Sequence, residues 1–398
     1  MKVLMIAPQP FFQPRGTPIS VLHRLNTLSK LGNNIDLVTY HLGETIPIKN
    51  VNYYRILTIP FVKKISIGPS TTKLFLDVFL FFKTLKMLIV NRYDVIHSHE
   101  EAGFLAIWLA KLFGVKHLYD MHSSLPQQLT NFKFSKFKPL INVFEFLEKR
   151  TIANSDAVIT ICPELYNYVK MHYPAKQLVL IENVADNSMI FQTNRIQLPD
   201  LRSKYQIGNR TIILYSGTLE PYQGIDLLLE SAKIVLNRQQ GVIFMVVGGH
   251  PEQIDTYKGM AQRLGIAQSF IFTGQVKPDE VKYYLDIADI LVTPRVEGNN
   301  TPLKIYEYLR SGKPVIATNH ITHTQVLNNR VSILTDINAN AFADGIMRVL
   351  TDDQLKQTIV SNALKLSEEK YSYDAYVKKT ETIYRVLSNG TYQGTEQS

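Results

Sequence analysis

Short apolar runs alternate with longer stretches of helical periodicity along the whole chain. The runs are rich in Val and Ile, as strands buried on both faces of a sheet are. Six lie in the first half, at Val3–Ile6, Ile35–Thr39, Asp94–His97, His117–Asp120, Ala157–Ile161 and Leu178–Ile181. Six lie in the second half, at Ile212–Tyr215, Val242–Val247, Phe270–Phe272, Ile290–Thr293, Val315–Thr318 and Val331–Leu334. This alternation predicts βαβ units, with one doubly wound parallel sheet in each half.

The segments between the runs have the spacing of helices that bury one face. After Pro18 one apolar stripe is formed by Val21, Leu22, Leu25, Leu28 and Leu31, and Gly32 ends it. We therefore expect two Rossmann-like α/β domains, at residues 1–183 and 184–370. A weaker amphipathic pattern over 371–390 predicts a C-terminal helix that packs back on the first domain, and the polar residues 391–398 are expected to fray.

Length and composition agree with this division. A chain of 398 residues is too long for one ordinary core, and its 45% hydrophobic and 19% charged residues are typical of globular proteins. Cys162 is the only cysteine, which excludes an intrachain disulfide and favours a reducing, cytoplasmic location. The apolar stretch from Leu74 to Val90 carries Asp77, Lys83 and Lys86, so we expect no transmembrane helix there.

The excess of positive over negative charge lies entirely in the first half of the chain. Residues 1–185 hold 21 Lys and Arg against 12 Asp and Glu, whereas the remainder holds 22 of each. In the segment 131–138 lysines alternate with phenylalanines, a combination that suits an anionic membrane surface at the inner face of a membrane. The alternative is a solvated basic face over ordinary core aromatics. Nucleic acid is not expected, because no recognised binding motif accompanies the charge.

Candidate chemistry follows the strands, since open parallel sheets bind ligands beyond the carboxyl ends of their strands. The most informative segment is 294–309, in which Thr301 is expected to cap a helix whose first residue is Pro302. Such a helix start attracts phosphate by about 0.3–1 kcal/mol, and Lys304 would add a full charge. Asn300, Lys304 and Glu307 would share one face, and the Glu307 carboxylate could accept both hydroxyls of a ribose. The alternative is a well-capped surface helix with a Lys–Glu pair.

The order of strand, glycine-containing loop, helix with Glu307 and the segment 311–317 resembles the donor-binding signature of family 4 glycosyltransferases. That resemblance implies the GT-B fold, two Rossmann-like domains that face a cleft. It also implies that Glu307 holds the ribose of a UDP- or GDP-linked sugar. The backbone of Thr301, Pro302 and Leu303 would meet the diphosphate.

The chain departs from the family pattern in two places. The first glutamate of the family's pair falls on Asn299, with Glu297 two positions away. In the loop 216–226 the usual Arg and Lys are replaced by Thr218 and Gln223. We expect Arg295 and Lys304 to supply the missing positive charge.

Three further glycines and one valine complete the expected donor site. Gly217 follows the strand 212–215, and Gly248 and Gly249 follow the strand 242–247, where glycine lets a ligand approach closely. By resemblance, backbone groups around Val276 would contact the base. A tight turn would use the same glycines.

The first domain should bind the acceptor. Arg15, Gly16 and Thr17 precede the first helix and resemble the family's acceptor loop, although only one glycine remains. A Gly-x-Gly-x-x-Gly fingerprint is absent there, which argues against a dehydrogenase.

Other polar residues follow later strands of the first domain. His122 matches the histidine near the reacting sugar in the family, and the segment 148–150 with Arg150 matches a basic position near the acceptor. His99 lies in a segment of histidines and acids, 97–101, which we interpret as a polar wall rather than a metal site, because no familiar ligand spacing is present.

The resemblance implies retention of configuration without a metal or other cofactor, and no Asp-x-Asp occurs in the chain. The acceptor would be a sugar, a glycan or a lipid-linked molecule in glycan, polysaccharide or glycolipid synthesis. Two alternatives remain open. A sugar-nucleotide epimerase of the same fold could use Glu100, Glu101 and Asp120, and a non-catalytic sugar-nucleotide-binding subunit would explain the two departures.

Overall fold

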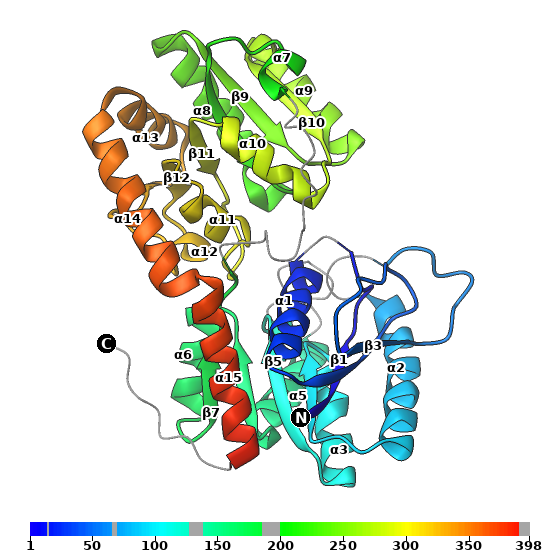
Figure 1. Cartoon of the computed structure of the whole chain (residues 1–398). Helices are drawn as coiled ribbons and strands as arrows, with labels where there is room; N and C mark the ends of the chain where they lie inside the picture. Colours follow the sequence, from blue (N-terminus) through cyan, green and yellow to red (C-terminus); the bar gives the residue numbers. More distant parts are fainter. Residues whose placement is uncertain (14–15, 66–69, 127–137, 185–199, 390–398) are drawn as a thin grey trace. The chain divides into compact units, whose positions relative to one another are not determined.

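The computed structural model describes residues 1–13, 16–65, 70–126, 138–184 and 200–389. The chain divides into two compact units. The first unit contains Met1–Asn183 and Tyr376–Ser398, and the second contains Val184–Ala375. Figure 1 shows that each unit is built around its own sheet. Arg15 and most of the Lys–Phe segment, 131–137, lie outside the described residues, as does the tail 391–398.

The first unit has a seven-stranded parallel sheet in the order β3-β2-β1-β4-β5-β6-β7. Its strands are β1 (Lys2–Ala7), β2 (Asn34–Thr39), β3 (Val51–Arg55), β4 (Val95–His99), β5 (Lys116–Met121), β6 (Ala157–Thr160) and β7 (Gln177–Leu180). Its helices are α1 (Gly16–Lys30), α2 (Thr71–Val90), α3 (Ala102–Phe113), α5 (Lys138–Asn154), α6 (Pro163–His172) and most of α15 (Tyr373–Asn389). The C-terminal helix therefore belongs largely to the first unit.

The second unit has a six-stranded parallel sheet in the order β10-β9-β8-β11-β12-β13. Its strands are β8 (Thr211–Ser216), β9 (Val242–Val247), β10 (Phe270–Gly274), β11 (Ile290–Thr293), β12 (Val315–Thr318) and β13 (Ile333–Thr335). Its helices are α7 (Leu201–Lys204), α8 (Ile225–Arg238), α9 (Pro251–Arg263), α10 (Val281–Ile287), α11 (Lys304–Arg310), α12 (Ile321–Thr324), α13 (Ala339–Thr351) and α14 (Asp353–Tyr371). The predicted α/β class and the doubly wound parallel sheets are confirmed.

Two local predictions differ from the structure. Strand β3 was not predicted, because its residues are partly exposed at the edge of the sheet and lack a continuous apolar run. Helix α1 begins at Gly16, so Gly16 and Thr17 lie in its first turn rather than in a loop. Pro18 is tolerated there, since the first turn of a helix does not need its amide hydrogens.

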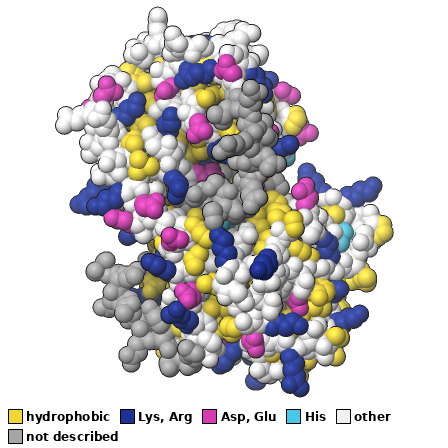
Figure 2. Space-filling model, in the orientation of Figure 1, with side chains coloured by type: hydrophobic (Ala, Val, Ile, Leu, Met, Phe, Trp, Pro, Cys, Tyr) yellow, Lys and Arg dark blue, Asp and Glu magenta, His cyan; other side chains and the backbone are white. Residues whose placement is uncertain are grey.

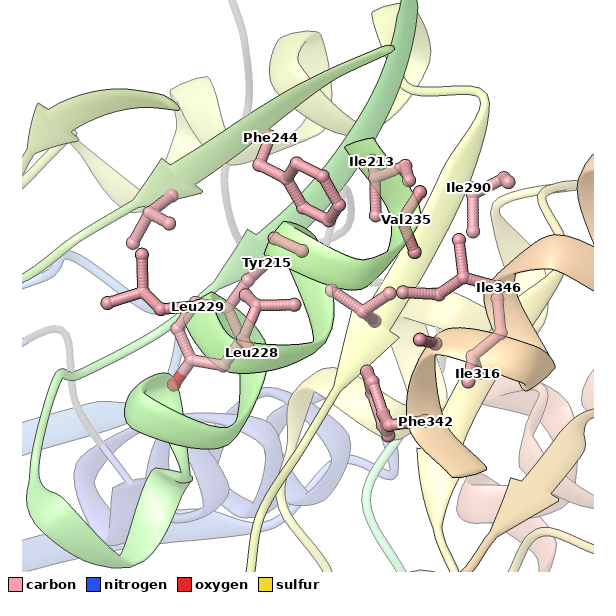
Figure 3. Packing of buried hydrophobic residues seen from close by; sticks show 14 of the residues in the cluster. Ile213, Tyr215, Leu228, Leu229, Val235, Phe244, Ile290, Ile316, Phe342 and Ile346 are labelled. Carbon is pink, nitrogen blue, oxygen red and sulfur yellow. The ribbon is translucent and has the colours of Figure 1, made fainter. Parts of the chain in front are cut away.

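The second core shows how the predicted periodicity packs. Helix α8 lies against α13, and both contribute side chains to a cluster with strands β8, β9, β11 and β12 (Figure 3). Its labelled members are Ile213, Tyr215, Leu228, Leu229, Val235, Phe244, Ile290, Ile316, Phe342 and Ile346. Each fully buried aliphatic side chain contributes roughly 1.5–3 kcal/mol. This core fixes the strand ends from which the functional loops leave.

Candidate functional site

Three glycine-containing loops meet at the carboxyl end of the second sheet. The amide of Gly217 donates to the carbonyl of Val247 at 2.9 Å, and the amide of Gly248 donates to the carbonyl of Gly274 at 2.9 Å. Gly248 has a φ of +121°, and a Cβ there would overlap the carbonyl oxygen of Gly217. Glycine is therefore required for the backbones to approach this closely.

The loop after β11 joins the loop after β8. The amide of Val296 donates to the carbonyl of Tyr222 at 3.0 Å, and a Cβ on Gly224 would overlap the carbonyl of Pro294. Strands β8 and β11 are neighbours, and the order of the sheet reverses between them. That is the switch point at which doubly wound sheets bind ligands.

Lys304 places a buried cation at this switch point. Its Nζ lies 3.7 Å from the centroid of the Tyr215 ring, and a Cβ on Gly217 would lie 2.7 Å from it. The ammonium has no hydrogen-bond partner in the part of the chain that the structure describes. Burial, together with the nearby Arg295, lowers the pKa of Lys304 well below its usual range, against a smaller opposing effect of Glu307.

Arg295 provides a second cation beside Lys304. Its Nε donates to the carbonyl of Glu297 at 2.8 Å, and its guanidinium lies 5.0 Å from the centroid of the Tyr222 ring. A Cβ on Gly298 would overlap this guanidinium. Burial lowers the pKa of Arg295. Two basic side chains, Lys304 and Arg295, are thus held close together at the end of the sheet.

The start of α11 differs from the prediction. The helix begins at Lys304, Leu303 precedes it without a side-chain cap, and Thr301 is not the N-cap. Thr301 is instead buried, and the carbonyls of Pro302 and Leu303 accept from the amides of Ile305 and Tyr306, three residues further along the chain. Asn300 lies outside the helix, so only Lys304 and Glu307 share a helical face.

The remaining predicted donor residues lie in the same loops or beside them. Gln223 donates through Nε2 to the Thr218 hydroxyl at 3.4 Å, and its buried Oε1 has no hydrogen-bond partner among the described residues. The carbonyl of Asn299 accepts from the Gln325 side chain at 2.6 Å. Gly249 packs against the side chain of Leu219. The side chain of Val276 is partly buried and packs against the hydrophobic core.

His323 was missed from the sequence because no motif surrounds it. Its Nδ1 donates to the carbonyl of Thr318 at 2.9 Å, and its Nε2 accepts from the Thr293 hydroxyl at 3.0 Å. Thr318 in turn donates through its hydroxyl to the carbonyl of Arg295. Burial lowers the pKa of His323 to about 3. The neutral imidazole of His323 therefore holds Thr318, and the Thr318 hydroxyl holds the loop that contains Arg295.

A second polar cluster lies at the carboxyl end of the first sheet. Asp120, at the end of β5, accepts from Nε of Arg24 at 2.8 Å through Oδ2. His97 Nε2 lies 3.3 Å from the same oxygen, and His122 Nε2 lies 3.4 Å from Oδ1. All four side chains are buried. Burial alone would raise the pKa of Asp120, but Arg24 and the histidines hold it well below its usual range.

His99 and His122 form a close imidazole pair within this cluster. Nδ1 of His99 lies 2.9 Å from Nε2 of His122, so one ring donates to the other. Burial and the neighbouring His97 lower the pKa of His99 well below its usual range. His99 is therefore neutral, and it lies beside His122, which the sequence resemblance assigns to a position near the reacting sugar.

The C-terminal helix α15 also contributes to this cluster. Its residue Tyr384 lies 287 positions after His97 in the chain. His97 Nδ1 accepts from the Tyr384 hydroxyl at 2.8 Å, because its Nε2 faces the carboxylate of Asp120. The Tyr376 ring lies 4.9 Å from the Arg24 guanidinium. No local sequence signal indicated Arg24, Tyr376 or Tyr384.

The predicted acceptor residues do not all join this cluster. Thr17 donates to Oε1 of Glu100 at 3.1 Å, at the end of β4, and Gly16 is exposed at the start of α1. Arg150 lies elsewhere, with its guanidinium 5.3 Å from the centroid of the exposed Trp108 ring. In the same segment, Glu148 contacts the loop after β5. Its carboxylate accepts from the amide of Leu125 at 2.9 Å.

The cluster also has the geometry of a cation site. His97, His99 and Asp120 offer ligand atoms that lie within 4.8 Å of one another, a grouping that the sequence spacing did not indicate. However, the Arg24 guanidinium already compensates the charge of Asp120. The predicted polar wall, in which one carboxylate orients several imidazoles, stays a prediction.

Comparison with known proteins gives two family matches that together cover most of the chain. Residues 14–188 match the model described as Glycosyltransferase Family 4, and residues 199–366 match Glycosyl transferases group 1. The chain is 26% identical to an uncharacterized glycosyltransferase of Methanocaldococcus jannaschii, over 97% of this chain and 98% of that protein. It is 24% identical to a phosphatidyl-myo-inositol mannosyltransferase of Mycobacterium tuberculosis, over 98% and 97%.

Solved structures share the fold. Sucrose-phosphate synthase from Thermosynechococcus elongatus superposes with a TM-score of 0.76 at 20% identity, over 98% of this chain and 100% of that one. HepE of Anabaena in complex with UDP superposes with a TM-score of 0.72 at 18% identity, over the same shares.

Proposed function

Because the chain is a glycosyltransferase of the GT-B fold, with a Glycosyltransferase Family 4 domain followed by a group 1 domain, we propose that it transfers a sugar from a UDP- or GDP-linked donor to an acceptor hydroxyl with retention of configuration. The second unit would bind the nucleotide-sugar and the first unit the acceptor. A lipid-linked acceptor is supported by the lipid named for the mannosyltransferase relative.

The buried ammonium of Lys304 is the observation that carries this proposal. A buried charge that has no partner costs several kcal/mol unless a counter-ion is bound. Lys304 and Arg295 lie together at the switch point, beside glycines that allow close approach of a ligand. A nucleoside diphosphate supplies the missing negative charge and fits such a loop. The two cations would therefore replace the Arg and Lys that Thr218 and Gln223 do not provide.

The same residues account for catalysis. As the glycosidic bond of the donor breaks, negative charge develops on the departing diphosphate, and Lys304 and Arg295 would stabilise it from fixed positions. The acceptor hydroxyl would attack from the face that the diphosphate leaves, and its proton would pass to a phosphate oxygen of the leaving group. Glu307 would accept the ribose hydroxyls. His122, oriented by Asp120, would hold the transferred sugar.

Incubation with a panel of UDP- and GDP-linked sugars tests this proposal, with released nucleoside diphosphate and donor binding measured with and without a lipid extract. Transfer should need an acceptor and persist in EDTA, because the two fixed cations take the electrostatic role of a metal. Lys304→Ala and Arg295→Ala should each weaken donor binding about 10–100-fold. Lys313→Ala is the matched control, since its exposed ammonium only meets the carbonyl of Asp286.

Other results would support other functions. Conversion of the donor to an epimer without any acceptor would indicate an epimerase. Donor binding without either transfer or hydrolysis would indicate a binding subunit. Unchanged donor binding in both the Lys304 and the Arg295 variants would refute the proposed diphosphate site.

A further inference from the structure

Helix α2 of the first unit exposes an apolar face along its whole length. It buries Leu76, Leu80, Thr84, Met87 and Leu88 against the unit. The opposite face carries large apolar side chains that are between 44% and 69% exposed: Leu74, Phe75, Val78, Phe82, Ile89 and Val90. These positions recur with the spacing of one helical stripe. A stripe of this size is unusual on the surface of a protein that meets only water.

Neighbouring segments extend this apolar surface. Phe61, which precedes α2, is 76% exposed, and its ring centroid lies 6.3 Å from that of Phe75. Helix α3 contacts α2 and exposes Trp108 and Leu112 four positions apart. Of the 16 exposed large hydrophobic side chains among the described residues, 13 lie in the first unit. We call the exposed side chains of α2 and α3, with Phe61, the α2–α3 surface.

The charges on the α2–α3 surface have one sign. Lys86 and Lys111 are exposed on the two helices, and Lys63 and Lys64 are exposed just after Phe61 in the chain. The only carboxylate of α2, Asp77, accepts from the Tyr40 hydroxyl at 2.6 Å, and α3 contains no acidic residue. Hydrophobic and basic side chains lie together at the lower right of Figure 2, where Figure 1 places α2. The surface therefore combines exposed aromatic rings with lysines and shows no exposed carboxylate on its two helices.

We propose that the α2–α3 surface docks the first unit onto a lipid bilayer that contains anionic headgroups. Phenylalanine and tryptophan side chains insert at the headgroup level, and each lysine gains from the negative surface potential. Among the described residues no helix is long and apolar enough to cross a membrane. The inference rests on the proposed function, because the membrane attachment would bring the enzyme to an acceptor carried by a lipid.

A second copy of the chain is a poorer occupant. A two-fold contact brings the same patch of each copy together, so the lysines of the two surfaces would face one another without carboxylates between them. Like charges in such a contact repel. Anionic headgroups provide the complementary charge that a second copy lacks.

Co-sedimentation with vesicles tests the proposal. The full chain should bind vesicles of phosphatidylcholine with 30% phosphatidylglycerol (about one lipid in three, enough to give a negative surface potential), and binding should weaken as salt rises. The double variant Phe75→Ser and Phe82→Ser should bind at least about tenfold more weakly. Lys64→Glu with Lys86→Glu should lose about as much on these vesicles and little on pure phosphatidylcholine. Ile337→Ser with Leu364→Ser, both exposed in the second unit, is the matched control.

The outcomes separate the possibilities. Equal binding of all variants, or binding that ignores lipid charge, would overturn the proposal. Sedimentation velocity of the Phe75 and Phe82 variant detects the other occupant: dissociation of a dimer without any vesicle binding by the parent chain would assign the surface to a second copy. Donor binding measured on the same variants should be unchanged. A chain that binds vesicles but no nucleotide-sugar would leave this inference standing and refute the proposed function.

Discussion

The Lys304 ammonium lies 3.7 Å from the centroid of the Tyr215 ring, and the Tyr215 hydroxyl is fixed by donation to the carbonyl of Thr218 at 2.6 Å. An ammonium over a desolvated aromatic ring gains about 2 kcal/mol, which offsets only part of the cost of burying the charge. The ring holds the cation in position without neutralising it. The proposed diphosphate site would therefore be organised before its ligand binds.

Replacing Lys304 with Met should separate stability from binding. The substitution keeps much of the side-chain volume and removes the unpaired charge, so the free energy of unfolding at neutral pH should rise by about 1 kcal/mol or more. Donor binding should fall about 10–100-fold, because the diphosphate loses a charge-assisted contact. Urea unfolding and calorimetry measure the two effects.

The pH dependence provides an independent check on Lys304. Its pKa is lowered in the folded protein, so in the window below the ordinary lysine pKa the unfolded chain binds more protons. The parent protein should therefore gain stability as pH rises through that window, and Lys304→Met should lack this gain. A large loss of stability in the Met variant at neutral pH would mean that Lys304 is paired in solution.

Gly248→Ala should disrupt the glycine loops of the second unit. Its φ of +121° is strained for alanine, and the added Cβ would overlap the carbonyl of Gly217. We expect a loss of at least about 2 kcal/mol in the free energy of unfolding and weaker donor binding. Gly259→Ala is the control, because this helical glycine of α9 has only the end of Arg263 near the new Cβ, at 3.9 Å. The control should keep or slightly raise stability.

Asp120→Asn should destabilise the first unit by about 3–5 kcal/mol, because it leaves the buried Arg24 without its counter-charge. The pKa of Asp120 is lowered in the folded state, so its stabilising effect is present above the ordinary aspartate pKa and is lost as pH falls through the folded value. In Asp120→Asn the free energy of unfolding should no longer fall in this way as the pH is lowered. Asp344→Asn, which breaks an exposed pair with Arg238, should change stability by about 1 kcal/mol or less.

His323→Gln should reduce the sensitivity of the second unit to acid. Burial lowers the pKa of His323 to about 3, so between that value and the ordinary histidine pKa the unfolded chain binds an extra proton. Stability should therefore fall as pH drops through this window, by about 1.4 kcal/mol per pH unit for this group. The slope of unfolding free energy against pH measures it. A slope in His323→Gln equal to that of the parent protein would contradict the assignment.

Where sequence reasoning failed, non-local contacts were responsible. The helix start at Thr301 was wrong because Ser, Thr and Pro signals describe isolated helices, whereas Thr301 is buried by its surroundings and the helix begins at Lys304. Strand β3 was missed because an edge strand needs no continuous apolar run.

The sequence by itself determined the α/β class, the parallel sheets and the loops that carry polar residues. Apolar periodicity depends on residues close together in the chain, and strand ends follow from it. Only the tertiary structure decided that Asp120 meets Arg24 across 96 positions, that Tyr384 meets His97 and that the Lys304 ammonium is buried beside Tyr215. Burial and charge compensation depend on which distant segments pack together, and the local sequence pattern does not specify those contacts.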